Sequence, residues 1–374
     1  MSLFLHTRRR RRRFIPFAFV ALLALLGAAL VGCGANDDEE PTETATSAVE
    51  TTVTGTATSG TSTSTATPTP SGDGLRDVTL MLNWTPNAQH AGIYLALANG
   101  WYEEQGINLE VVEPAAAGAD QVVGTGGAEF GVSQAESLLP ARAAGVPVVS
   151  IATIMPYNDS SFMSLASAGI ERPRDFEGKT YGGYGGALET ELLHTLVACD
   201  GGDPDKVNMV EVGNIDYLAG MEQGRFDFVW VFEGWDALRA RDVEGKDINS
   251  IKFVDWLDCI PDWYTPIFIT SEDMIANDPE LVRAFALAFT ARGYEAAISD
   301  PAAATDALLA AAPELDQSLV AASVQYHAPK FVGEGGWGTQ DAEVWSAFAD
   351  FLVTAGLLDQ PIDSDAAFTN EFLP

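Results

Sequence analysis

The sequence has few of the residues that build metal centres and disulfide frameworks. It contains three cysteines and four histidines in 374 residues, with no CxxC or HExxH pattern. Three cysteines are too few for a disulfide scaffold, and the histidines do not have the spacing of metal ligands. We therefore expect no metal site. The sequence does not decide whether Cys199 and Cys259 pair, because it does not tell how far apart they lie.

Basic residues are also scarce. The chain has 20 Lys and Arg against 53 Asp and Glu, a formal net charge of −33. Removing the six arginines of residues 8–13 leaves 14 basic residues against 53 acidic ones, a net charge of −39. A nucleic acid would be repelled by such a surface. This composition therefore excludes nucleic-acid binding and suits a solvated extracytoplasmic domain.

The first 32 residues are predicted to be a targeting segment and not part of the fold. Six arginines are followed by an apolar run over residues 14–31, and small residues precede Cys33. This order is typical of a secretory signal, and a Cys after Leu-Val-Gly resembles a bacterial lipobox. An uncleaved membrane anchor is the alternative, since roughly 18 apolar residues is near the lower limit for a span. We favour lipidation of Cys33, because it lies where cleavage would occur, and predict anchoring to the cell membrane on its extracytoplasmic face.

Residues 33–74 lack aromatic side chains and consist mostly of Thr, Ser, Ala, Gly and Pro. Such a segment buries too little apolar surface to offset its chain entropy, so it is predicted to be a disordered tether. About 40 flexible residues give a reach on the order of 35 Å.

The remaining 300 residues exceed what one hydrophobic core usually serves, so two lobes are expected. Strand-like and helix-like stretches alternate, which predicts an α/β fold with mainly parallel sheets. A late block of helices indicates that the first lobe is built from both ends, residues 75–165 and 265–374, and the second from residues 166–264. Among the predicted strands are 77–83, 107–112, 162–166 and 265–269, and among the predicted helices 88–105, 187–199, 234–241, 279–299 and 301–311.

A strand–helix–strand unit over residues 82–114 contains the first candidate site. Asn83, Trp84 and His90 lie where its first strand ends, the edge at which open α/β sheets bind ligands. Trp84 offers a stacking surface, and the Asn83 amide can read the donor–acceptor edge of a heteroaromatic ring. His90 lies near a helix N-terminus, which disfavours its cationic form. The alternatives are a packed Trp and a capping His.

Two further turns between a strand and a helix are candidate ligand contacts. Ser133 is either a ligand donor or a helix N-cap. Residues 181–187 form a Gly-rich turn with Tyr184, and Glu189 follows in the first helical turn. The turn lacks GxGxxG and a Walker lysine, so ring stacking suits it better than phosphate binding.

The fourth candidate is the aromatic stretch of residues 230–236, which includes Glu233 and Trp235. A carboxylate at the end of an apolar strand needs a donor or a cation. Glu233 is therefore predicted to pair with N–H groups of a ligand, and the alternative is an N-cap or a partner of Arg239.

The stretch LNWTPNAQHAGIYLALANGWYEEQGINLEVVEP is very similar to the opening of the thiamine-pyrimidine-precursor family. This family includes bacterial solute-binding proteins for formylaminopyrimidine and the fungal thiamine pyrimidine synthase. The resemblance continues through GTGGAEFGVSQAES, ARAAGVPVVSIATI and FTNEFLP, so it covers nearly all of residues 77–374. It implies a two-lobed periplasmic binding protein fold of type II that closes on a ligand. The bacterial members imply an ABC permease and ATPase as partners.

The synthase branch of this family is an enzyme, but its chemistry needs residues that this chain lacks. In that branch a Lys holds pyridoxal phosphate and a His is consumed as substrate; the matching positions here are Ser133 and Ser137. A Schiff base needs an amine, which Ser does not have. The synthase's cysteine cluster is reduced here to Cys259. We therefore expect a monomeric binding protein with no cofactor and no catalytic residue. An aminopyrimidine is the expected ligand and riboflavin the alternative, and transport is not distinguished from sensing.

Overall fold

The computed structural model describes residues 74–287 and 292–374. The predicted signal segment, Cys33 and the tether lie outside the described residues. Within the described part, no helix has the length and hydrophobicity needed to cross a membrane.

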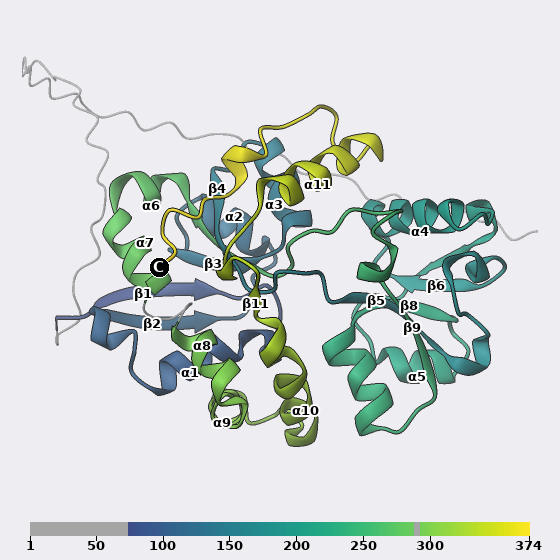
Figure 1. Cartoon of the computed structure of the whole chain (residues 1–374), viewed down its shortest axis with the longest axis horizontal. Helices are drawn as coiled ribbons and strands as arrows, with labels where there is room; N and C mark the ends of the chain where they lie inside the picture. Colours follow the sequence, from purple (N-terminus) through teal and green to yellow (C-terminus); the bar gives the residue numbers. More distant parts are fainter. Residues whose placement is uncertain (1–73, 288–291) are drawn as a thin grey trace, which may run out of the picture. The chain divides into compact units, whose positions relative to one another are not determined.

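Two five-stranded sheets organise the fold (Figure 1). The first has the order β2 (Ile107–Val112), β1 (Arg76–Met81), β3 (Phe130–Ser133), β10 (Ile267–Ser271) and β4 (Val148–Thr153). The second has the order β7 (Asn208–Glu211), β6 (Thr180–Gly183), β8 (Phe228–Phe232), β5 (Ser160–Leu165) and β9 (Ile248–Lys252). Within these two sheets all pairings are parallel except those of β10 and β5. The short strands β11 (Val332–Gly333) and β12 (Gly336–Trp337) form a separate antiparallel pair. The prediction of a two-lobed α/β fold with mainly parallel sheets is confirmed.

The two reversed strands are those that follow a crossing between the sheets. The chain leaves the first sheet after β4 and enters the second as β5, then leaves it after β9 and returns as β10. β5 pairs with β8 and β9 in the second sheet. The predicted lobe boundary at residue 166 had assigned this strand to the first lobe, because its apolar sequence does not tell which sheet it joins.

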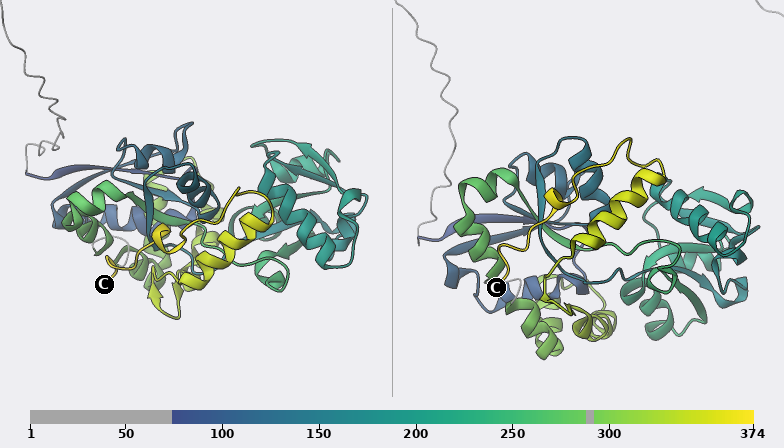
Figure 2. Two further views of the ribbon diagram at one scale, coloured as in Figure 1. Left: turned by 90° about the horizontal axis from the view of Figure 1, so that it is seen from above. Right: turned by 45° about the horizontal axis from the view of Figure 1, so that its top comes forward.

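Helices cover both sheets. The helices α4 (Ala187–Cys199) and α9 (Pro301–Ala311) have the predicted bounds, and α10 (Gln317–His327) and α11 (Ala342–Thr354) follow α9. The others are α1 (Ala91–Ala98), α2 (Gly118–Gly124), α3 (Ala135–Ala143), α5 (Tyr217–Glu222), α6 (Glu272–Asn277), α7 (Pro279–Phe285) and α8 (Arg292–Ser299). Figure 2 shows α8 to α10 gathered beside α1 on the first sheet, so helices from both ends of the chain cover it.

Two predicted helices differ from the structure, and a third includes residues that the structure does not describe. The helix expected over residues 88–105 starts as a short 3₁₀ turn and α1 ends at Ala98, because Gly100 turns the backbone with a φ of 70°. The helix expected over 279–299 is described as α7 and α8, since residues 288–291 are not described. Residues 233–237 and 239–243 form π-helical turns instead of the expected α-helix.

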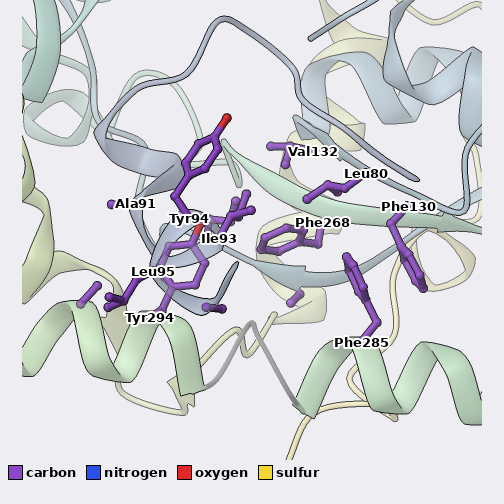
Figure 3. Packing of buried hydrophobic residues seen from close by; sticks show 14 of the residues in the cluster. Leu80, Ala91, Ile93, Tyr94, Leu95, Phe130, Val132, Phe268, Phe285 and Tyr294 are labelled. Atoms are coloured by element: carbon purple, nitrogen blue, oxygen red, sulfur yellow. The ribbon is translucent and has the colours of Figure 1, made fainter. Parts of the chain in front are cut away.

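The first core packs aromatic rings from the late helices against the strands. Figure 3 shows Phe285 and Tyr294 beside Phe268 of β10 and Phe130 of β3. Tyr294 is fully buried, and its hydroxyl donates to the carbonyl of Gln89 at 2.8 Å. This contact ties α8 to the loop that carries Asn83 and Trp84.

A disulfide closes the second lobe. Cys199 at the end of α4 is bonded to Cys259 in the returning crossing, with Cα atoms 5.8 Å apart. The structure therefore answers the question that the sequence left open. The bridge joins the helix that follows the Gly-rich turn to the segment that leads back to the first lobe.

Candidate functional site

A cleft of about 550 Å³ lies between walls that come from both sheets. Its residues follow the carboxyl ends of four strands: Asn83 after β1, Gln134 after β3, Tyr184 after β6, and Phe232 at the end of β8. Ligands of α/β sheets bind at this edge, and the volume is typical of small-molecule sites. The sheet topology thus places two pairs of strand ends around one cavity.

Five predicted site residues line this cleft, and three do not. The lining residues are Asn83, Trp84, Tyr184, Glu189 and Trp235. The three that lie elsewhere are His90, Ser133 and Glu233.

Two aromatic rings remain exposed in the cleft. Trp84 is 44% exposed and Tyr184 is 48% exposed, whereas most aromatic side chains of the described chain are buried. The hydroxyl of Tyr184 is 2.7 Å from that of Tyr217, which also lines the cleft. Exposed rings in a concave wall suit a flat ligand, since aromatic pairs contribute about 0.5–1.5 kcal/mol beyond burial.

His90 orients Asn83 instead of facing the cleft. Its ring is fully buried, and its Nδ1 accepts the backbone N–H of Asn87 at 3.3 Å. Its Nε2 therefore carries the proton and donates to Oδ1 of Asn83 at 3.0 Å. Burial lowers the pKa of His90 to about 3, so the ring is neutral. Nδ2 of Asn83 then donates to Oε1 of Gln134 at 3.2 Å. The amide groups of Asn83 and Gln134 thus have a defined direction.

Ser133 also lies behind the cleft wall. It is buried, and its hydroxyl is 2.8 Å from both carboxylate oxygens of Asp120. Burial raises the pKa of Asp120 to about 6. The hydroxyl is therefore engaged within the protein.

Glu189 holds the Gly-rich turn in place. Its carboxylate accepts hydrogen bonds from the hydroxyl of Tyr181 at 2.8 Å, the backbone N–H of Tyr184 at 3.0 Å and that of Gly186 at 2.9 Å. The bond from Gly186 is the Glu half of a capping box, in which a Glu at the third helical position accepts the N-cap N–H. Gly186 has no side chain to supply the other half. Glu189 touches the cleft, but its contacts serve mainly to position Tyr184.

Glu233 points away from the cleft. Its carboxylate accepts hydrogen bonds from Arg241 at 2.8 Å and from Ser161 at 3.1 Å. The physical reason is the π-helical turn that follows β8, which directs Glu233 to the opposite side. The alternative partner Arg239 was also wrong, since Arg239 pairs with other carboxylates, at 3.0 Å and 2.6 Å.

Asp236 supplies the cleft carboxylate that the prediction assigned to Glu233. It lies three residues further along the same turn and lines the cleft. Burial raises the pKa of Asp236 to about 6, and the nearby Arg239 guanidinium opposes this shift. The aromatic stretch was the correct signal, but the local turn decides which acid faces the cavity. Three further cleft residues were not predicted: Gln134, Asn214 and Tyr217. Their positions shortly after strands were the only sequence signal that could have indicated a place in the cleft.

Comparisons with known proteins agree with this architecture. The model of the family described as NMT1/THI5 like matches residues 87–304. The formylaminopyrimidine-binding protein of Halalkalibacterium halodurans is 30% identical over 307 residues, which cover 80% of this chain and 91% of that protein. The riboflavin-binding protein RibY of Chloroflexus aurantiacus is 29% identical and covers 80% of this chain and 87% of its own. A 4-amino-5-hydroxymethyl-2-methylpyrimidine phosphate synthase of Legionella pneumophila is 27% identical. The match covers 79% of this chain and 92% of that protein.

Solved structures extend the comparison to the fold. The aliphatic sulphonate binding protein SsuA of Escherichia coli superposes with a TM-score of 0.62 at 16% identity, covering 78% of this chain and 96% of that one. The alkanesulfonate-binding protein SsuA of Xanthomonas axonopodis pv. citri gives 0.60 at 15% identity, covering 78% and 98%. With the family model matching more than half of its length, this chain belongs to the NMT1/THI5-like family, and its lobes have the periplasmic binding protein fold.

Proposed function

We propose that this chain is an extracytoplasmic solute-binding lipoprotein of an ABC importer, and that its cleft binds a thiamine pyrimidine precursor of the formylaminopyrimidine or hydroxymethylpyrimidine type. The observation that carries this proposal is the pair of exposed rings, Trp84 and Tyr184, in a cleft that also presents oriented amides and a carboxylate. The relative that binds formylaminopyrimidine supports the choice of ligand.

Each wall of the cleft supplies part of the recognition. The pyrimidine ring stacks on Trp84 from the first lobe, and Tyr184 approaches it from the second. The amides of Asn83 and Gln134, oriented by His90, meet the polar edge of the ring. Because each lobe alone offers half of these contacts, the ligand favours the closed arrangement of the lobes.

Asp236 is the group that we assign to the exocyclic amine of the ligand. Within the described residues its carboxylate meets backbone N–H groups of the turn, at Phe232 and Asp236, but no side-chain donor or ion-pair partner, so it keeps acceptor capacity for ligand N–H groups. The cation of the cleft, Arg239, is already paired with Asp216 and Glu244. Anionic ligands such as sulfonates need free cations or backbone donors. The cleft therefore suits an aminopyrimidine better than a sulfonate.

Anchoring, partners and the absence of catalysis belong to the same proposal. Lipidated Cys33 and the tether of residues 33–74 hold the binding domain at the extracytoplasmic face of the cell membrane, where a monomer delivers ligand to a permease driven by an ATPase. Ser133 and Ser137 offer no amine for pyridoxal phosphate, and Ser133 is engaged by Asp120. This chemistry supports a binding protein with no cofactor over a synthase.

Riboflavin is the second candidate ligand. The cleft volume of about 550 Å³ exceeds the need of a single pyrimidine ring, and a relative of similar identity binds riboflavin. An isoalloxazine ring would use the same stacking surfaces.

Calorimetric titration of the purified full-length chain distinguishes the candidates. The ligands are formylaminopyrimidine, hydroxymethylpyrimidine, thiamine and riboflavin. We expect the tightest binding for one of the two pyrimidines. Binding of riboflavin alone would favour the second candidate, and binding of none of the four would refute the proposal of a vitamin-precursor carrier.

A further inference from the structure

A second cavity, of about 560 Å³, lies where the chain first crosses between the sheets. Its walls include Asn158 and Ser160 from that crossing, Lys252 from the end of β9, and Lys330, three residues after α10. We call it the hinge cavity. None of its lining residues lines the cleft described above. It is therefore a separate site that also contacts both lobes.

The buried carboxylates of the hinge cavity are already occupied. Asp159 accepts hydrogen bonds from the backbone N–H of Gly234 and the hydroxyl of Tyr326, both at 2.8 Å. Glu233 accepts its hydrogen bond from Arg241 at 2.8 Å. Both acids thus direct their lone pairs at protein donors. They leave little acceptor capacity for a ligand.

By contrast, two buried polar groups of the hinge cavity have no partner. Asn158 is 2% exposed and Ser160 is 1% exposed. Oδ1 of Asn158 accepts the backbone N–H of Ser160 at 2.8 Å, which fixes the direction of the amide. Nδ2 of Asn158 and the hydroxyl of Ser160 then make no hydrogen bond with any described residue. Buried polar groups are almost always hydrogen-bonded. We therefore expect a ligand of this cavity to supply a hydrogen-bond acceptor for these two donors.

Two lysines make a negatively charged acceptor the better choice. Nζ of Lys330 is 3.8 Å from Asp159 and lies 3.5 Å above the ring of Tyr326. Lys252 makes no ion pair with another described residue. Three acids, Asp159, Glu233 and Asp255, line the same cavity; protein donors engage the first two, and Asp255 is exposed to solvent. Charge-assisted hydrogen bonds from Lys to a carboxylate are stronger than neutral ones.

The rest of the wall is apolar. Met155, Val254 and Val332 line the cavity, and Tyr157 and Leu257 do so while remaining 56% and 49% exposed. These side chains suit a ligand with a hydrophobic body. We propose that the hinge cavity binds a small organic carboxylate, with its head on Asn158, Ser160 and the two lysines and its body against this apolar wall.

The test uses 4-iodobenzoate as an anionic probe and 4-iodobenzamide as its neutral counterpart. Crystals of the full-length chain soaked in 4-iodobenzoate are expected to show anomalous iodine signal in the hinge cavity. Calorimetry is expected to show binding of the benzoate and at least about tenfold weaker binding of the benzamide, because the amide carries no charge.

Matched variants test whether 4-iodobenzoate binds at the hinge cavity. Lys330→Met is expected to weaken 4-iodobenzoate at least about tenfold, and Lys252→Met serves the same purpose if the first variant does not fold. Asn158→Asp keeps the acceptor for Ser160 N–H but removes the free donor, so it too should weaken the probe. Lys246→Met removes the same charge from a surface pair with Glu222 and should leave binding unchanged.

Several results would overturn the proposal. Equal affinity for the benzamide would refute recognition of charge. Iodine found only in the cleft, or a hinge cavity filled with water alone, would refute the site. Retention of probe binding in Trp84→Ala supports a site outside the cleft, and loss in that variant argues against it.

Discussion

The backbone N–H of Gly234 donates a hydrogen bond to the carboxylate of Asp159 at 2.8 Å. Gly234 follows β8 of the second sheet, whereas Asp159 ends the crossing from the first. On its other side, Gly234 touches α10: its carbonyl accepts the hydroxyl of Ser323, and a Cβ at this position would lie 2.4 Å from the ring of His327. This glycine is thus the point where α10 of the first lobe packs against the second.

Gly234→Ala is therefore expected to destabilise the protein by about 1–3 kcal/mol, because overpacking forces neighbouring groups to move. Urea unfolding monitored by circular dichroism measures the change. Gly186→Ala is the control, since its Cβ would meet nothing closer than 3.5 Å. Equal stability of the Gly234 variant and the wild type would contradict the packing seen around α10.

Trp84→Ala is expected to weaken binding of the pyrimidine ligand by about tenfold or more, because both stacking and apolar burial are lost. Trp84→Phe keeps a ring and should retain most of the affinity. Calorimetry checks both variants. Full affinity in Trp84→Ala would refute stacking on this side chain.

Asp236 gives the affinity a pH dependence. Burial raises its pKa to about 6, so the carboxylate that accepts ligand N–H groups is mostly protonated at pH 5. From this pKa, affinity should fall about tenfold between pH 7.5 and pH 5.

The Asp236→Asn variant should bind the pyrimidine ligand more weakly at pH 7.5. Its affinity should also lose the part of the pH dependence that comes from protonation of Asp236. The ratio of wild-type to variant affinity at each pH cancels protonation of the ligand itself. A ratio that does not change with pH would exclude Asp236 as the titrating group.

Glu136 is expected to make stability fall as the pH rises from about 4.5 to about 8. Burial raises the pKa of Glu136 to about 8, well above its ordinary value of 4.5. The folded state therefore holds a proton that the unfolded state releases between pH 4.5 and 8, and stability is lost as the pH rises through this window. Each 1 kcal/mol lost corresponds to about 2–4 °C in Tm for a chain of this size.

Thermal unfolding at pH 5.5 and 8.5 tests this prediction. Glu136→Gln should reduce the difference in Tm between the two conditions. An identical difference in variant and wild type would show that other groups cause it.

The bridge between Cys199 and Cys259 closes a loop with a sequence separation of 60 residues. Replacing both cysteines by Ser should lower stability by about 2–4 kcal/mol, mainly because the unfolded chain gains freedom. Calorimetric unfolding with and without reductant measures the loss. Reductant should lower the Tm of the wild type and leave that of the double variant unchanged.

Local pattern was enough to predict much of the fold. Residues 107–112, 187–199 and 301–311 have the predicted bounds, because each has strong periodicity between clear stop signals. The sequence also pointed to the strand ends that carry Asn83, Trp84 and Tyr184. Sheet membership was harder, since the pattern of β5 does not tell which sheet it joins.

The orientation of single side chains was not predictable in the same way. The sequence placed Glu233 in the right stretch, but a π-helical turn, set by contacts with α10 and Asp159, turns it away and presents Asp236. Of the two interpretations of His90, the structure bears out the buried, capping imidazole and not the ligand contact, and its other ring nitrogen supports Asn83. Such outcomes depend on neighbours distant in the chain.

The position of β10 has a consequence for the order in which the protein is assembled. β10 lies between β3 and β4, although more than a hundred residues separate it from both in the chain. The first sheet therefore cannot close until residue 271 has emerged from the ribosome. The second sheet is built from residues 160–252 without interruption and can form earlier. The lobe encoded first is thus the lobe completed last.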